Sequence, residues 1–383
     1  MHNTHAIYHM MVDYAPIFSD LGLEAYGLRF VRPSPNMVMP FLDGSSICLY
    51  PDVERTCESI ARFSPKDADA YRDMSARFQT YMDDFIAPST YVKPHSILDG
   101  VARMMETQAG REINALAGMT PREIVGDLFA HERVKALMLF AACFWGLDYD
   151  LEGLGYLVPL FLNRATNYRL SIGGSHNLAH VLGKVIAENG GMVLGGQILK
   201  RIVVEDGVAT GVELDDGTVI RATQFVASSL DPHQTFLEYV GEEQGGRDLL
   251  DPYFLQRVKD WQWEKMSLLG VHLALERRPH LKAAESAPEI DDALVYIMGY
   301  ESEADVVRHF DAVYAGELLP GGGFNACFPT VHDPRQAPPG KHTALISQHA
   351  PYRLVDGGRR TGTGSGNSRP TSAWKPCEGT CRT

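Results

Sequence analysis

The most regular pattern of hydrophobic and polar positions in the chain runs over residues 171–232. Apolar residues there first recur at helical spacing, which predicts an amphipathic helix over residues 175–189. Ser175 is a suitable N-cap for this helix, and the Asn-Gly-Gly run at 189–191 is a suitable end. The apolar face of the predicted helix consists of Leu178, Val181, Leu182, Val185 and Ile186.

After this helix the pattern changes to short alternating runs separated by turns. Two Asp-Gly pairs, Asp206-Gly207 and Asp216-Gly217, are strong turn signals. They predict a three-stranded antiparallel meander, with a short buried strand before it and a strand returning to the main sheet after it. The predicted strands are residues 192–194, then 198–204, 208–214 and 219–220 in the meander, and finally 224–227.

The segment before this stretch predicts a hairpin sheet followed by helices. A mostly helical block over residues 52–165 is indicated by helix-start signals at Asp52, Ser64 and Thr120. Ser64 and Thr120 are each followed by proline, and Asp52 places a negative charge at a helix N-terminus. The predicted strands of the hairpin region are residues 26–31, 37–41 and 46–50.

The segment after this stretch predicts further strands of the same sheet. A helix over residues 302–314, capped by Ser302, interrupts them. The predicted strands are residues 267–275, 294–299, 325–330 and 343–349.

Composition narrows the class of protein. The chain has 383 residues, of which 45% are hydrophobic, so it can bury a sizeable core. The net charge of −13 and the dispersed basic residues argue against nucleic acid as a partner. There is no run of about 18 apolar residues and no signal-peptide pattern, so we expect no membrane span and a cytoplasmic location. Four of the six cysteines have apolar neighbours, which predicts buried thiols.

Histidines gather near the start of the chain, in the segment 1–22. His2, His5 and His9 lie there with Asp13 close behind. His5 and His9 have helical spacing, but no further residue completes a coordination sphere at a recognisable spacing. We therefore predict a polar terminal helix and no metal site.

The meander and the residues that leave it carry a family resemblance. Residues 204–217 read Val-Glu-Asp-Gly-x-Ala-x-Gly-Val-x-Leu-x-Asp-Gly, and residues 228–236 read Ser-Ser-Leu-Asp-Pro-x-x-Thr-Phe. With the Gly-Gly helix before them, these motifs resemble the phytoene desaturase-like FAD-dependent oxidoreductases. The similarity is to the phytoene dehydrogenase-like or pyridine nucleotide-disulfide oxidoreductase domain 2 group, and it extends from about residue 23 to about residue 356.

The resemblance implies an α/β fold with two kinds of domain. One is an incomplete Rossmann-like FAD-binding domain that contains the three-stranded meander, and the other is an α+β substrate domain of sheet and helices. The implied parts are a polar segment 1–22, substrate-domain parts 23–170 and 233–356, a partial FAD-binding domain 171–232, and a disordered tail 357–383.

The resemblance also implies where FAD would bind. Gly173 and Gly174, at the mouth of the predicted helix, would contact the flavin, although a tight loop explains them equally well. The backbone of Ile198 would face the adenine end. Ser228 and Ser229 would lie near the pyrophosphate.

Two parts of the family pattern are missing from this sequence. It contains no G-x-G-x-x-G fingerprint between a strand and a helix, and no glycine-rich FAD segment near its end. A truncated form is therefore expected. Because a parallel sheet without its central strands exposes edges, a homo-oligomer or a partner chain that completes the FAD domain is also expected.

The function implied by the resemblance is FAD-dependent oxidation of a C–C bond in an extended apolar substrate. Met37, Met39 and Phe41 would face that substrate, although core packing explains them as well. No catalytic residue is identified. Two alternatives stay open: a non-catalytic module that binds apolar ligands and has lost FAD, and a relative of the flavin amine oxidases.

Overall fold

The structure is a computed structural model that describes residues 3, 6–93, 96–240, 250–355 and 381–382. The chain divides into two compact units, each described here by itself. The first consists of Met1–Val185 and Glu264–Thr383, and the second of Ile186–Trp263. Helix α10 (His176–Glu188) begins in the first unit and ends in the second.

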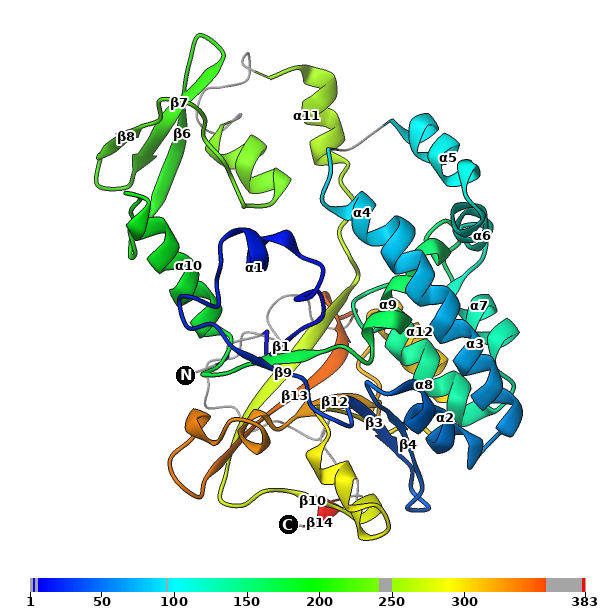
Figure 1. The fold of residues 1–383 in the computed structure, drawn as a ribbon. Helices are drawn as coiled ribbons and strands as arrows, with labels where there is room; N and C mark the ends of the chain where they lie inside the picture. Colours follow the sequence, from blue (N-terminus) through cyan, green and yellow to red (C-terminus); the bar gives the residue numbers. More distant parts are fainter. Residues whose placement is uncertain (1–2, 4–5, 94–95, 241–249, 356–380, 383) are drawn as a thin grey trace. The chain divides into compact units, whose positions relative to one another are not determined.

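A six-stranded sheet organises the first unit, in the order β4-β3-β11-β12-β13-β9 (Figure 1). Neighbouring strands are antiparallel except β3 and β11, which run parallel. The strands predicted from alternation are confirmed, with small changes at their ends. Their bounds are β3 (Met37–Pro40), β4 (Ser46–Leu49), β9 (Met266–Leu275), β11 (Val295–Met298), β12 (Phe324–Cys327) and β13 (His342–Pro351).

The alternation of side chains across this sheet produces two separate hydrophobic cores. One face carries Met37, Met39, Ile297, Cys327 and Leu345, all in the larger core. The opposite face carries the residues next to them in sequence, and these form the smaller core: Val38, Tyr296, Met298, Ala326, Ala344 and Ile346. Strands β3, β4, β11, β12 and β13 are therefore buried on both sides over their centres, whereas the edge strand β9 is largely exposed.

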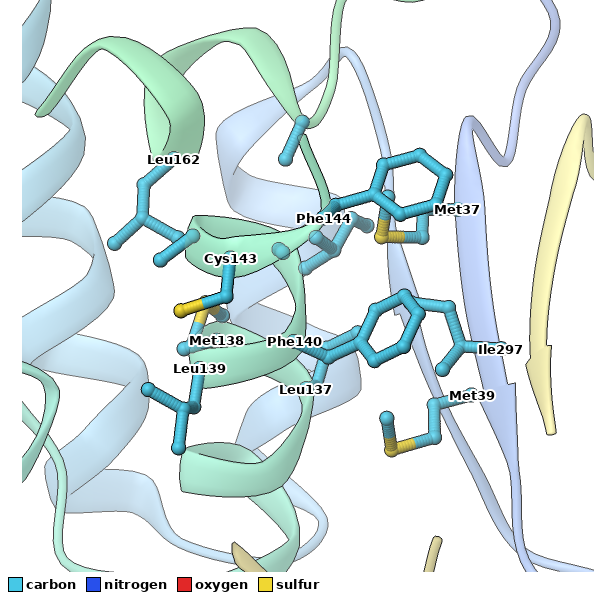
Figure 2. Close-up of a cluster of buried hydrophobic side chains, with 14 of the residues drawn as sticks. Met37, Met39, Leu137, Met138, Leu139, Phe140, Cys143, Phe144, Leu162 and Ile297 are labelled. Atoms are coloured by element: carbon cyan, nitrogen blue, oxygen red, sulfur yellow. The ribbon is translucent and has the colours of Figure 1, made fainter. Parts of the chain in front are cut away.

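A helical block packs on the first of these faces, as predicted for residues 52–165 (Figure 1). Its central helix is α8 (Glu132–Cys143), which is buried along most of its length. Figure 2 shows Phe140 and Phe144 pointing toward Met37, Met39 and Ile297 of the sheet. Fully burying such a side chain contributes roughly 1.5–3 kcal/mol.

The other helices of the first unit surround α8 or flank the block, except the short helix of residues 16–20, whose Phe18 packs in a separate small cluster with Val181 and Val185. They are α1 (Pro16–Asp20), α2 (Val53–Ala61), α3 (Pro65–Tyr81), α4 (Ala87–Thr90), α5 (Ile97–Glu106), α6 (Gln108–Leu116), α7 (Pro121–Leu128), α9 (Val158–Arg164) and α12 (Glu303–Tyr314). Among the residues that the structure describes, no helix combines the length and apolar character that a membrane span requires.

The helix caps predicted at Asp52, Ser64, Thr120 and Ser302 are confirmed. The Asp52 carboxylate accepts from two backbone N–H groups of α2, and Ser64 accepts from the N–H of Asp67 in α3. Thr120 and Ser302 each form a reciprocal capping box at the start of α7 and α12. The predicted buried thiols are also found, at Cys48, Cys57, Cys143 and Cys327.

The N-terminal segment differs from the predicted polar helix. It forms strand β1 (Tyr8–His9), which pairs with β5 (Arg169–Ser171), and β5 pairs with β2 (Phe30–Val31). The strand predicted over 26–31 is thus limited to its last two residues, because turns occupy the residues before it. His2 and His5 lie outside the described residues.

The second unit contains the predicted meander. Strands β6 (Leu199–Glu205), β7 (Val208–Leu214) and β8 (Val219–Arg221) form a three-stranded antiparallel sheet. Asp206 and Gly207 form the first turn with positive φ angles, as the Asp-Gly signal predicted. The unit also contains helix α11 (Pro252–Lys259).

Two predicted strands beside the meander are wrong. Residues 192–194 and 224–227 form no strand, and Met192, Val193 and Leu194 are exposed rather than buried. Within the described residues no neighbouring strand pairs with either segment, so an apolar run alone did not produce a strand. Of the tail predicted to be disordered, residues 357–380 and 383 lie outside the described part, and Cys381–Arg382 form strand β14, paired with β10 (His280–Leu281).

Candidate functional site

The first unit contains a cavity of about 610 Å³ on the helix-covered face of its sheet, here called the sheet cavity. It is lined by residues 6–12 of the N-terminal segment, by Phe144 and Trp145 after α8, and by side chains of β9, β12 and β13. Its volume is in the range of sites that hold drug-sized ligands.

The register of β12 and β13 sets the floor of the sheet cavity. Asn325 pairs with Ser347, and Cys327 pairs with Leu345. Because residues opposite each other in an antiparallel pair point to the same face, all four side chains reach the cavity from one side. Leu268 of β9 continues this floor.

Aromatic rings form one wall of the sheet cavity. The Tyr8 ring stacks on Tyr168 with centroids 5.1 Å apart, and it meets the Trp145 ring edge-on at 6.2 Å. The indole N–H of Trp145 donates to the Tyr168 hydroxyl at 3.0 Å. Phe144 lies 5.2 Å from Trp145 and completes the group. Such rings hold one another in place and present a rigid apolar surface.

Few polar atoms face this apolar space. The Asn325 amide donates weakly to the Tyr8 hydroxyl at 3.5 Å, and its Oδ1 has no hydrogen-bond partner among the described residues. His9 Nε2 is likewise buried without a partner among them. Burial lowers the pKa of His9, which favours its neutral form, and burial raises the pKa of Tyr8.

The structure places the predicted substrate-contacting residues in the main core. Met37, Met39 and Phe41 are fully buried, with Met37 beside Phe144 and Met39 beside Phe140 (Figure 2). None of the three lines the sheet cavity. Met37 and Met39 belong to β3, which β11 separates from the strands that form the floor of the cavity.

Gly173 and Gly174 occupy the turn before α10, as predicted. Their φ angles are 89° and 95°, a region that favours glycine. The N–H of Gly173 donates to Asp333 Oδ2 at 2.6 Å. The N–H of Ser175 donates to Asn3 Oδ1 at 2.7 Å. Side chains of the chain itself therefore already satisfy the amides at this helix start.

Asp333, in the loop after β12, is the charged side chain that accepts a hydrogen bond from the glycine turn. Burial raises its pKa, but hydrogen bonds from Gly173, Arg335 and Gln336 outweigh that effect, so the pKa is lowered. Gln336 also accepts from Asn3 at 2.7 Å. The result is a connected polar network that fixes the turn against the loop after β12.

The other predicted cofactor contacts belong to the second unit. Ile198, Ser228 and Ser229 are all exposed. The Ile198 carbonyl accepts from the N–H of Asp215 at 2.9 Å, and the Ser228 hydroxyl lies 2.8 Å from that of Thr235. These three residues belong to the second unit, whereas the glycine turn belongs to the first.

Sequence reasoning did not identify the residues of the sheet cavity. Asn325 and Ser347 lie on strands that were predicted. Following the alternation of side chains along these strands would have placed both polar side chains on an otherwise apolar face. Tyr8 gave no comparable signal, because its segment was expected to be a polar helix. Trp145 follows a predicted helix and carries no pattern of its own.

Comparison with known proteins finds sequence similarity to oxidoreductases. No protein-family model matches it. A limonene dehydrogenase subunit of Castellaniella defragrans is 37% identical over 365 residues, which are 93% of this chain and 66% of that protein. The pyridine nucleotide-disulfide oxidoreductase domain-containing protein 2 of Mus musculus is 24% identical, over 89% of this chain and 64% of that protein.

A solved structure supports the fold. An oxidoreductase from Methanosarcina mazei superposes with a TM-score of 0.52 at 17% identity, covering 87% of this chain and 64% of the other. Several phytoene desaturases also match in sequence over shorter stretches. The chain is therefore homologous to the phytoene desaturase-like oxidoreductases, as its motifs indicated. It spans less than two thirds of the length of the two relatives compared above.

Proposed function

We propose that this protein is an FAD-dependent oxidoreductase that removes hydride from a C–H bond of an apolar substrate held in the sheet cavity. The observation that carries the proposal is the large apolar cavity itself, in a chain homologous to a limonene dehydrogenase subunit and to desaturases. The names of those relatives describe hydrocarbon and polyene oxidation, which requires such a cavity.

The residues near the glycine turn fit a flavin in one respect. Ser171 Oγ and Arg169 Nε are buried without partners among the described residues, immediately before Gly173. Unsatisfied buried polar groups are costly, so a bound group with hydrogen-bonding capacity would stabilise them. We propose that Ser171 holds the flavin together with Gly173 and Gly174.

When bound, the flavin would supply the hydride acceptor. The residues of this chain would do the rest. The aromatic wall and the sheet floor would orient the substrate and exclude water. Oxidation of a C–C bond to a C=C bond would pass a hydride from one carbon to the flavin and release a proton from the next carbon. His9, which burial keeps neutral, would accept that proton on Nε2.

Ile198, Ser228 and Ser229 remain the proposed contacts for the adenine and pyrophosphate ends of FAD. Their exposure leaves them accessible to a dinucleotide. Met192, Val193 and Leu194 are exposed beside them in sequence, and exposed apolar runs favour association. We propose that a second copy or a partner chain covers this segment.

The alternatives have different support. No carboxylate lines the described part of the sheet cavity, which favours a hydrocarbon over the ammonium group that an amine oxidase binds. A binding module without FAD is favoured by one observation. The amides of Gly173 and Ser175 are already used by Asp333 and Asn3, so the helix start offers less to a cofactor.

A dye-linked assay tests the proposal. The purified protein, supplied with FAD, is given limonene or putrescine, and the reduction of an artificial electron acceptor is followed. We expect reduction with limonene and none with putrescine. Reduction with putrescine alone would support an amine oxidase. No reduction with either, together with no retained flavin, would support the binding module.

A further inference from the structure

Asn325 is an anomaly on the face that it occupies. Only 4% of its surface is exposed, and its neighbours on that face are Ser347, which lies opposite it, and apolar side chains of the larger core such as Cys327 and Leu345. Its Oδ1 accepts no hydrogen bond from any residue that the structure describes. Leaving a buried amide oxygen unsatisfied destabilises a fold, so a group from outside the chain is expected to supply the missing donor.

The surroundings restrict what that group can be. Asn325 Nδ2 lies 3.5 Å from the Tyr8 hydroxyl, a long hydrogen bond that leaves the amide loosely held. Ser347 pairs directly with Asn325 across β12 and β13, so a second hydroxyl lies on the same side of the sheet. The rest of the floor is apolar, at Cys327, Leu345 and Leu268.

Three kinds of apolar ligand differ in what they can offer Asn325. A hydrocarbon offers nothing, and a carbonyl can only accept. A hydroxyl donates to Oδ1 and also accepts, so it satisfies the amide in either of its two orientations. Ser347 or Tyr8 can then complete the pattern around the same hydroxyl.

We infer that the sheet cavity binds an apolar molecule carrying a single hydroxyl group, and that this hydroxyl donates to Asn325 Oδ1 on the floor of the cavity. The inference rests on the proposed function only in taking the cavity as the ligand site. If the hydroxyl binds in this way, Asn325 selects among apolar ligands. This selection does not depend on the direction of the redox reaction.

Three cyclic compounds of nearly equal shape test this: menthol, menthone and p-menthane, which bear a hydroxyl, a carbonyl and neither. Their dissociation constants are measured by displacement of N-phenyl-1-naphthylamine, a fluorescent apolar probe, and no flavin turnover is needed. We expect menthol to bind roughly tenfold more tightly than p-menthane. Asn325→Leu, which keeps the shape and removes the amide, should abolish that preference and leave p-menthane binding unchanged or tighter.

Cys327→Val is the matched control, because Cys327 lies on the same strand and lines the same cavity without an amide. It should change menthol and p-menthane binding in parallel. Circular dichroism and the melting temperature check that both variants fold, and Asn325→Ser is measured as well in case the leucine variant does not. Equal binding of menthol and p-menthane by the wild type would overturn the hydroxyl inference alone, because a water molecule would then satisfy Asn325. Failure to bind any of the three would instead remove the cavity from the proposed function.

Discussion

At the scale of single residues, two buried histidines, His309 and His349, form a hydrogen-bonded network beside α8. The Tyr300 hydroxyl lies 2.7 Å from His309 Nδ1, and His309 Nε2 lies 3.1 Å from the backbone oxygen of His349. The His349 ring meets Phe140 edge-on, and its Nε2 lies 3.3 Å from the Phe144 carbonyl. This network ties α12 to α8 and to β13.

Acid should destabilise the protein through His349. Burial, aided by His309, lowers its pKa to about 4 from an ordinary value of 6.5. Between these two values the unfolded state binds more protons than the folded state, so stability is fully present above pH 6.5 and is lost as the pH falls toward 4. The full loss is roughly 3 kcal/mol. Denaturant unfolding at several pH values measures it.

His349→Gln is the comparison for this acid effect. Glutamine can still donate to the Phe144 carbonyl but does not titrate. The variant should therefore show a smaller fall in unfolding free energy between pH 7 and pH 4.5 than the wild type. Parallel curves for the two proteins would show that carboxylates, and not His349, cause the acid sensitivity.

Substitutions of Met39 distinguish a role in the hydrophobic core from contact with the substrate. Because it is fully buried against α8, Met39→Ala should lower the unfolding free energy by about 2–5 kcal/mol. Met39→Leu nearly conserves volume and should cost less than about 1.5 kcal/mol. Urea unfolding gives both values. If the Met39→Leu protein is stable but its affinity for p-menthane changes, Met39 contacts the ligand after all.

At the scale of secondary-structure elements, one carboxylate positions the central helix. Asp67, in the first turn of α3, is almost fully buried and accepts from the N–H groups of Ala130 and His131, just before α8. Asp67→Ala leaves these donors unsatisfied and should cost about 3 kcal/mol. Asp69→Ala, two residues along the same helix and exposed, is the control and should change urea stability by less than about 0.5 kcal/mol. Equal effects would show that Asp67 does not anchor α8.

Two neighbouring leucines of strand β9 provide a variant and its control for ligand binding in the sheet cavity. Leu268 lines the cavity and Leu269, the next residue, points to the other face; they are 40% and 46% exposed. Leu268→Trp should fill the cavity and weaken p-menthane binding at least about tenfold, because overpacking removes the space for the ligand. Leu269→Trp should bind normally. If both variants bind p-menthane like the wild type, the ligand lies elsewhere.

Elements were predictable where the local signal and the tertiary environment agree. The caps at Ser64 and Thr120 and the alternation of residues 267–275 were sufficient, because local hydrogen bonds and the sheet require those patterns. Residues 192–194 were predicted as a strand from apolar character alone, but a strand needs a neighbour to pair with. The N-terminal strand β1 depends on its long-range partner β5, which local periodicity does not reveal.

The site shows the same limit. Gly173 and Gly174 were predictable as a turn, since positive φ angles favour glycine. The hydrogen bond from the Gly173 amide to Asp333 was not predictable, because 160 positions separate the two residues in the sequence. Asn325 becomes unusual only when its strand is placed in the sheet, where its face turns out to be apolar.

At the scale of the whole molecule, the proposed function joins a sheet that holds an apolar ligand to a meander-containing unit that the family resemblance links to FAD. The first unit contains the cavity and the glycine turn, and the second contains the meander. The division into a substrate domain and a partial FAD-binding domain stays a prediction. The proposed function requires that one protein binds both the flavin and an apolar ligand in the sheet cavity.

The most direct test is an anaerobic spectrum. The purified protein is equilibrated with FAD, freed of excess flavin by gel filtration, and mixed with limonene in the absence of oxygen. We predict that flavin absorbance elutes with the protein and bleaches when limonene is added, and that Leu268→Trp retains the flavin without bleaching. A protein that retains flavin but never bleaches, or one that elutes without colour, would contradict the proposal that it oxidises an apolar substrate with FAD.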